Sequence, residues 1–579
     1  MKQKILPGIM FVVAALGWFG CNRPPSNIAM DKNNDVKPRF GNYHGLLADS
    51  AMVVSAHPAA SDIGVAILRK GGNAADAAVA VQFALAVCFP YAGNIGGGGL
   101  LVLRQADGEV NALDFREKAP LAAHRDMYLD QQGAVIPKLS EKGRLSTGVP
   151  GSVAGMVALH ARYGRLSWAE LLQPSIDLAR NGFAATAHEA KWLNEQKPDF
   201  QALNKGGTAY LVKDSEWREG DTLRQEDLAR TLERIRDHGR AGFYAGETAD
   251  LLLAEMKRGG ILTQADLDGY EAKWRAPLRG NFQGYGIVTM PPPSSGGIVL
   301  LQMLAMVADH PLKKWGPDAA PTIHVMVEAE RRAFADRSEY MGDPDFIKVP
   351  MAGLLDPAYL KARMADFDPQ RATPSDSIRH GNPRLEPTET THFSIIDPEG
   401  NAVSVTTTLN SPYGSKVWVA GAGFLLNNEM DDFSSKPGVP NIFGLVGNEA
   451  NAIAPGKRML SSMTPTIVEK DGKIFLVLGT PGGATIPTSI FQVILDVVVH
   501  GMTLQEAVDF KRFHHQWLPD EIMVEDSAFS TATWEVLRAM GHRVCAREPI
   551  GRVDAILRNP EGKLEGAADK RRDDVARGF

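Results

Sequence analysis

Three pairs of short β-rich runs follow residue 390, and a turn signal separates the two runs of each pair. The pairs are 391–397 with 402–409 across PEGN, 466–470 with 474–478 across DG, and 554–558 with 563–566 across NPEG. Runs of this kind, bounded by Gly, Pro, Asn and Asp, are typical of antiparallel hairpins. The pattern predicts a sheet concentrated in the last third of the chain.

The first half of the chain shows helical periodicity between glycine and proline loops. The predicted helices cover residues 61–69, 74–89, 153–163, 168–181 and 225–237. The apolar stretch 74–89 has about 16 residues, whereas a membrane-crossing helix needs about 20. We therefore expect a buried core helix there, with Cys88 in the core.

Two glycine clusters carry different expectations. The run NIGGGGL at 94–100 lacks the other residues of a nucleotide-binding fingerprint, so it favours tight turning or close backbone packing. Gly482 and Gly483 stand between a predicted strand and the apolar segment 490–499. Such a strand-to-helix turn can present backbone N–H groups to an anion.

Composition excludes several classes of protein. The chain has 62 Lys and Arg against 68 Asp and Glu, a formal net charge of −6, so no basic excess points to nucleic acid. Its 44% of apolar residues is ordinary for a globular protein of this length and excludes disorder over most of the chain. Three cysteines cannot form a disulfide framework.

The N-terminus has the form of an export signal at 1–21. Lys2 and Lys4 precede the apolar run 5–19, which ends at Gly20 and Cys21. Two outcomes are compatible with this pattern: lipid attachment at Cys21 in a bacterial envelope, or a soluble periplasmic product cut before residue 31. Residues 22–45 form a polar leader.

Several common catalytic sites fail on spacing. The chain has no Gly-x-Ser-x-Gly elbow and no glycine loop that continues into Gly-Lys-Ser/Thr. His188-Glu189 lacks the second His of a zinc protease, and the adjacent His514 and His515 would point apart on a strand or a helix. We therefore expect neither a metal nor a cofactor.

One segment is unusually dense in polar and β-forming residues: PTETTHFSIIDPEGNAVSVTTTLN at 387–410. Further motifs stand at fixed distances from it: RKGGNAADAAVAV (69–81), NIGGGG (94–99), LDFREKAP (113–120), GFLLNNEMDDFS (423–434), LSSMTPT (460–466), GTPGG (479–483) and FHHQWLPDE (513–521). In order and spacing the set resembles the gamma-glutamyltransferase family. The resemblance spans nearly the whole chain after the leader.

The resemblance implies an N-terminal nucleophile hydrolase: an α/β protein with four αββα layers, made as a precursor that cuts itself between Glu389 and Thr390. Residues 46–389 would form a large subunit intertwined with a small one, 390–579. Cleavage places on Thr390 both a hydroxyl, a poor nucleophile, and an α-amino group of pKa about 7.7 to 8.0 that can act as its base. Thr391 is the competing candidate, but strand alternation would turn it to the other face.

The resemblance also implies roles around Thr390. Thr408 would hydrogen-bond the nucleophile and assist the self-cleavage. The backbone N–H groups of Gly482 and Gly483 would stabilise the oxyanion, a contribution of about 2.7 to 4 kcal/mol per donor. After attack on a γ-glutamyl amide, the acyl-enzyme would pass its γ-glutamyl group to water or to an amino acid or peptide acceptor.

A γ-glutamyl group carries a free α-carboxylate and a free α-amino group, so its pocket must hold both charges. The planar guanidinium of Arg116 suits the carboxylate, while Glu429 and Asp432 can face the ammonium at the opposite end. Many bacterial relatives carry glutamine where this chain has Glu429. The implied substrate-binding residues are Arg116, Asn410, Glu429, Asp432, Ser461 and Ser462.

The loop 434–455 resembles the lid of bacterial gamma-glutamyltransferases, with Phe443 where many lids carry tyrosine. A lid favours short γ-glutamyl peptides such as glutathione. Two rival functions remain open: an acylase of the same fold that acts on glutaryl β-lactams, and an uncleaved lipoprotein that only binds γ-glutamyl compounds.

Overall fold

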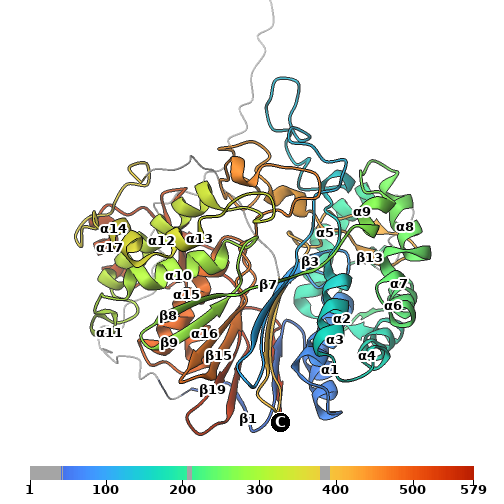
Figure 1. Cartoon of the computed structure of the whole chain (residues 1–579), viewed down its shortest axis with the longest axis horizontal. Coiled ribbons are helices and arrows are strands. Elements are labelled where there is room, and N and C mark those ends of the chain that lie inside the picture. The colour runs from blue at the N-terminus through green and yellow to red at the C-terminus, as the bar shows by residue number, and fades with distance from the viewer. Residues whose placement is uncertain (1–40, 42, 205–210, 379–390) are drawn as a thin grey trace, which may run out of the picture.

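The computed structural model describes residues 41, 43–204, 211–378 and 391–579. Two seven-stranded antiparallel sheets lie face to face at the centre of the molecule, and helices cover the outer face of each (Figure 1). This arrangement confirms the predicted αββα layers. The export signal with Cys21, most of the polar leader, and the predicted cleavage site at Glu389 and Thr390 lie outside the described residues.

Both sheets combine strands from the two sides of residue 390. The first sheet has the order β1 (Leu46–Ala48), β20 (Leu564–Ala567), β19 (Asp554–Arg558), β15 (Lys473–Gly479), β14 (Thr466–Lys470), β9 (Tyr285–Thr289), β8 (Leu278–Phe282). The second has the order β21 (Val575–Gly578), β2 (Met52–Ser55), β10 (Thr391–Ile396), β11 (Ala402–Thr408), β3 (Gly98–Arg104), β4 (Val110–Phe115), β7 (Lys273–Arg275). The two parts of the chain are therefore intertwined, as expected.

All three predicted hairpins are confirmed as the antiparallel pairs β10–β11, β14–β15 and β19–β20. The expectation that the sheet is concentrated in the last third was wrong, because β1–β4 and β7–β9 all precede residue 290. The central strand β3 explains the error. All seven of its residues are buried, so GGLLVLR lacks the alternation of polar and apolar residues that marks a half-exposed strand.

Apolar side chains from both sheets form the interior between them. Met52 and Val54 of β2 and Leu100 of β3 belong to one buried cluster with Val477 of β15 and Ile556 of β19. Strand β10 lies over β15 and β19, and β11 lies over β15. The strands that directly follow residue 390, β10 and β11, are thus packed against the first sheet.

Helices form the two outer layers (Figure 1). The second sheet is covered by α1 (Pro58–Arg69), α2 (Ala74–Cys88) and α3 (Ser152–Tyr163), with α4 (Trp168–Asn181) and α6 (Glu226–His238) further out. The first sheet is covered by α10 (Gly296–Val307) and α15 (Thr485–Val498), with α12 (Ala320–Tyr340) packed against α10 further out. The five predicted helices are confirmed to within a few residues at each end.

Helix α2 is buried along its whole length, and Cys88 is in the core as predicted. Asn73 and Asp76 start it with a capping box, since each side chain accepts a hydrogen bond from the other's backbone N–H at 2.9 and 3.0 Å. Among the described helices, none is both long enough and apolar enough to cross a bilayer.

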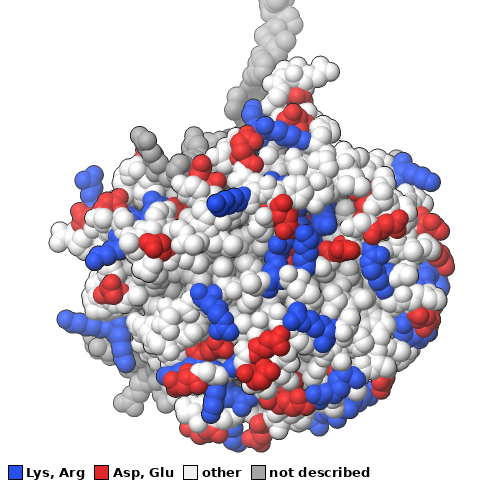
Figure 2. Space-filling view, in the orientation of Figure 1, with Lys and Arg blue, Asp and Glu red and all other residues white. Residues whose placement is uncertain are grey.

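Charges of both signs are interspersed over the visible face of the molecule (Figure 2). Among the described residues, this face carries no continuous basic track of the kind that binds a phosphate backbone. The distribution agrees with the net charge of −6.

The glycine run before β3 serves close backbone packing, as the sequence favoured. A Cβ atom on Gly97 would lie 2.1 Å from the carbonyl oxygen of Thr408, and one on Gly96 would lie 2.1 Å from that of Leu425. Asn94 ties the same segments together: its Nδ2 donates to the Thr408 carbonyl at 2.8 Å, and its Oδ1 accepts from the Gly97 amide at 3.0 Å. The end of β11 is therefore fixed by this loop.

We expect Gly97→Ala to lower the free energy of unfolding by about 1–3 kcal/mol, because the added methyl group forces a backbone shift in a packed core. Gly353→Ala is the matched control, since a Cβ there meets no atom within 4 Å. Urea denaturation of the two variants measures the difference. Equal stabilities would contradict the close packing.

Candidate active site

One pocket gathers the predicted site residues. It is lined by Arg116, Arg337, Thr408, Asn410, Glu429, Asp432, Phe443, Leu445, Leu460, Ser461, Ser462, Met463, Gly483 and Ile486. Every site residue predicted from the sequence and described by the structure is in this set except Gly482, which adjoins Gly483. The structure thus brings together motifs separated by more than 300 positions in the chain, from Arg116 to Gly483.

The ends of strands place these side chains. Arg116 directly follows β4, and Thr408 is the last residue of β11. Glu429 and Asp432 bound a short 3-10 turn, Glu429–Asp432. Because β4 and β11 both run antiparallel to β3, their C-terminal ends lie close together on either side of the first residues of β3.

Thr408 has a defined hydrogen-bond geometry. Its Oγ1 accepts from the backbone N–H of Asn410 at 2.7 Å, and its O–H interacts with the Glu429 carboxyl, which lowers the pKa of that group. Thr391 begins β10 opposite Thr407, the neighbour of Thr408. Thr391 does not line the pocket, and its hydroxyl accepts from the guanidinium of Arg552 at 3.2 Å. Its side chain is therefore committed elsewhere.

The Gly482–Gly483 turn requires glycine. The φ angles are +138° and +52°, which L side chains rarely adopt, and a Cβ on Gly482 would lie 2.4 Å from Thr485 Oγ1. Helix α15 begins at Thr485, directly after the turn. The N-terminus of α15, the positive end of its dipole, therefore lies next to Gly483, which lines the pocket.

Buried charges surround Arg116, whose side chain is only 1% exposed. Its guanidinium lies 2.5 Å from Glu429 and 3.4 Å from Glu117, and it donates to Asp432. The expectation that cation and anions occupy opposite ends of the pocket was wrong. Burial removes the solvation of each charge, so opposite charges within reach of one another pair directly.

The three carboxyl groups titrate near neutral pH. Burial raises the pKa of Glu429 to about 8 and those of Glu117 and Asp432 to about 7, against the opposing effect of Arg116. As pH rises through this range the carboxyls ionise. The pocket then becomes more favourable to a ligand ammonium and less favourable to a ligand carboxylate.

The loop 434–455, predicted as a lid, contributes the buried side chains of Phe443 and Leu445 to the lining of the pocket. Two hydrogen bonds tether the loop to the acidic turn. Asn441 Nδ2 donates to Asp432 at 3.1 Å, and the backbone N–H of Ile442 donates to Asp431 at 2.8 Å. Two of the acids that pair with Arg116, Glu429 and Asp432, thus belong to the turn that holds this loop.

Two charged residues of this region were missed from the sequence. Arg337 lies in the charge-rich stretch RRAFADRSEY, which is typical of a solvated helix face, yet nearly all of α12 is buried. Glu117 follows Arg116 directly, a pattern usually found on surfaces, but both are buried here. No local signal separates a buried charge run from an exposed one. Only the three-dimensional packing of α12 does so.

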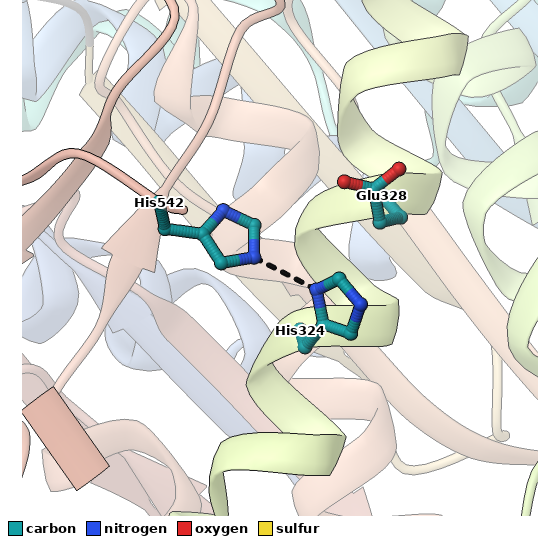
Figure 3. A group of neighbouring side chains, drawn as sticks. All are labelled: His324, Glu328 and His542. Carbon is teal, nitrogen blue, oxygen red and sulfur yellow. Dashed lines mark hydrogen bonds between the residues drawn. The ribbon is translucent and has the colours of Figure 1, made fainter. Parts of the chain in front are cut away.

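A second group of polar side chains is drawn in Figure 3, and none of its three members lines this pocket. His324 Nδ1 and His542 Nε2 are 2.7 Å apart, and with the Glu328 carboxylate their ligand atoms lie within 4.8 Å of one another. Glu328 already pairs with Arg331 at 3.5 Å and Arg332 at 2.5 Å. A cation placed there would face two guanidiniums, so the group is better explained as a buried hydrogen-bond network.

Stacked antiparallel sheets between helical layers, with a polar pocket at the strand ends, define the class of N-terminal nucleophile hydrolases. The Gamma-glutamyltranspeptidase family matches residues 60–579, and the chain belongs to this family. The resemblance noted in the sequence is thereby confirmed.

Relatives and solved structures agree with this assignment. A glutathione hydrolase proenzyme of Pseudomonas sp. (strain A14) is 47% identical over 91% of this chain and 93% of its own length. One of Escherichia coli (strain K12) is 45% identical over 93% of each. The crystal structure of cephalosporin acylase from Bacillus halodurans superposes with a TM-score of 0.82 at 26% identity, covering 95% of this chain and 99% of that one.

Glu429→Gln tests the buried carboxyl. In the folded protein the pKa of Glu429 is raised to about 8 from its ordinary 4.5. The neutral form stabilises the fold fully below about pH 4.5, and this contribution is lost as pH rises through about 8. We expect the melting temperature of the wild type to fall more steeply between about pH 5 and pH 8 than that of Glu429→Gln.

Glu449→Gln, which removes an exposed carboxylate, is the control and should follow the wild type. Parallel curves for the wild type and Glu429→Gln would contradict a raised pKa at Glu429.

Proposed function

We propose that this protein is a self-processing gamma-glutamyltransferase with glutathione hydrolase activity. The precursor cuts itself between Glu389 and Thr390, and Thr390 then attacks γ-glutamyl amides. The observation that carries this proposal is the single pocket that combines Thr408, the Gly482–Gly483 turn and the charged group around Arg116.

The reaction follows from the groups present. The α-amino group of Thr390 takes the proton of its own hydroxyl, and the oxygen attacks the γ-carbonyl of the substrate. The glycine turn at the start of α15 stabilises the oxyanion. The amine product leaves with a proton, and water or an acceptor amine then attacks the γ-glutamyl ester and restores the free threonine.

Thr408 suits the role of assistant. Its oxygen accepts a hydrogen bond from the Asn410 amide, and its O–H, which interacts with the Glu429 carboxyl, would turn to donate toward the nucleophile. Thr391, the residue after Thr390, pairs with Thr407, the residue before Thr408. This register supports a contact between Thr390 and Thr408.

Substrate binding exchanges the charge pairs already present. The α-carboxylate of the γ-glutamyl group replaces a carboxylate at Arg116, with hydroxyl donors from Ser461 and Ser462. The α-ammonium then pairs with Glu429 and Asp432. Relatives are named glutathione hydrolase proenzymes, which supports glutathione as the substrate.

The charge of the pocket argues against the acylase alternative. A glutaryl group has a carboxylate but no ammonium, so it would leave Glu429 and Asp432 without a ligand partner. Competition between glutathione and a glutaryl β-lactam separates the two enzymes. Preferential hydrolysis of the β-lactam would favour the acylase.

We also propose that the protein is exported through residues 1–21 to the cell envelope. Fractionation of cells that express the wild type and Cys21→Ser separates the two outcomes. Loss of membrane association in the variant indicates a lipid at Cys21, while periplasmic location of both proteins indicates a soluble product.

Thr390→Ala tests the central proposal. We expect a single uncut band on a denaturing gel and a fall in the release of γ-glutamyl p-nitroanilide dye of at least about 10³-fold, because the nucleophile is lost. The wild type should give two bands, with the smaller one beginning at Thr390 by N-terminal sequencing. Thr391→Ala is the matched control and should still be cut. An active Thr390→Ala protein, or an intact and inactive wild type, would overturn the proposal.

A further inference from the structure

Arg337 is a second guanidinium in the active-site pocket. It lies near the end of α12, is 5% exposed and lines the pocket together with Arg116 and Ser462. Burial lowers its pKa to about 10, so the side chain remains cationic at neutral pH.

The partners of Arg337 are hydroxyl groups. Its Nε donates to Ser295 Oγ at 3.0 Å, and one terminal nitrogen donates to Ser462 Oγ at 3.4 Å. No carboxylate in the described part of the chain forms an ion pair with it. Other buried arginines do have such partners: Arg116 with Glu429 and Asp432, Arg332 with Glu328, and Arg512 with Asp569.

A buried guanidinium without a counter-ion is costly unless a ligand supplies the charge. Arg116 cannot offer the same attraction, because Glu117, Glu429 and Asp432 already offset its charge. Asp432 attracts Arg337 across the pocket, but no carboxylate of the described residues pairs with it directly, so Arg337 contributes the less neutralised positive charge of the pocket.

Hydrogen-bond direction points the same way. A guanidinium can only donate, so Ser462 Oγ accepts from Arg337 and its own O–H is free to donate to a ligand. Ser295, the other partner of Arg337, donates to the carbonyl oxygen of Ser461 at 2.7 Å. Arg337 thus positions Ser462 directly and Ser461 through Ser295.

We infer that Arg337 is a second carboxylate-binding residue, which holds the α-carboxylate of the γ-glutamyl group together with Ser462. The inference rests on the proposed function and deepens it: donor specificity for an α-carboxylate depends on Arg337 as well as Arg116. Arg116 contacts both the carboxylate and the acids that bind the ammonium, whereas Arg337 has no direct ion pair with the described acids and contacts hydroxyl groups instead.

The test compares two ligands that differ only at the α-carboxylate: L-glutamate and its α-carboxamide. Isothermal titration calorimetry gives the dissociation constant of each for the purified protein, independently of turnover. For the wild type we expect glutamate to bind more tightly. For Arg337→Gln we expect this preference to fall by about tenfold or more, with little change for the carboxamide. The KM for γ-glutamyl p-nitroanilide should rise with a smaller change in kcat.

Arg337→Lys, which keeps the charge but loses the planar fork, should retain part of the preference. Arg363→Gln is the matched control, since Arg363 pairs with Asp336 of α12 at 3.1 Å but does not line the pocket. Its ligand preference should equal that of the wild type. A denaturing gel that shows two bands, and an unchanged melting temperature, identify folded variants. Arg337→Lys replaces Arg337→Gln where the latter does not fold.

Two results would overturn the inference: a carboxylate preference that survives in Arg337→Gln, or an equal loss of affinity for both ligands, which would indicate a purely structural role. Dye release by the wild type distinguishes failure of the proposed function from failure of this inference. If it releases no dye, the enzymatic proposal fails whatever the ratio of the two dissociation constants.

Discussion

The buried ionic group around Arg116 constrains the rest of the site. A guanidinium and three carboxyls withdrawn from water are tolerated only when they face one another, so the end of β4 and the acidic turn must meet. The same turn accepts hydrogen bonds from the loop 434–455 through Asp431 and Asp432. The turn 429–432 therefore determines the charge pairs of Arg116, the position of the loop and the shape of the pocket together.

The parts of the fold that could be predicted from the sequence carry local signals. Turn residues mark the hairpins, and the apolar run of α2 predicts a buried helix. Both features can be predicted because they depend on residues that are neighbours in the chain. Strand β3 could not be found in this way. It lies in the middle of a sheet covered on both faces, and only its pairing with β4 and β11 makes it a strand.

The site shows the same division. Arg116, Thr408, Asn410 and Gly483 stand in motifs whose order along the chain is specific, so resemblance identifies them together. Their mutual contacts could not be predicted. The pairing of Arg116 with Glu429 is a consequence of burial, which a sequence does not state. Arg337 was missed for the same reason, because an arginine on a helix is read as solvated until its surroundings are known.

The charge balance of the pocket has a consequence for binding. Two guanidiniums, those of Arg116 and Arg337, face the carboxyls of Glu117, Glu429 and Asp432, so full ionisation of the acids leaves an excess of negative charge. Burial relieves that excess by raising the pKa values of the acids to about 7 or 8. An arriving ammonium would supply the missing positive charge and lower these pKa values again. Binding of the ammonium is therefore linked to proton release, because the acids ionise where the ammonium binds.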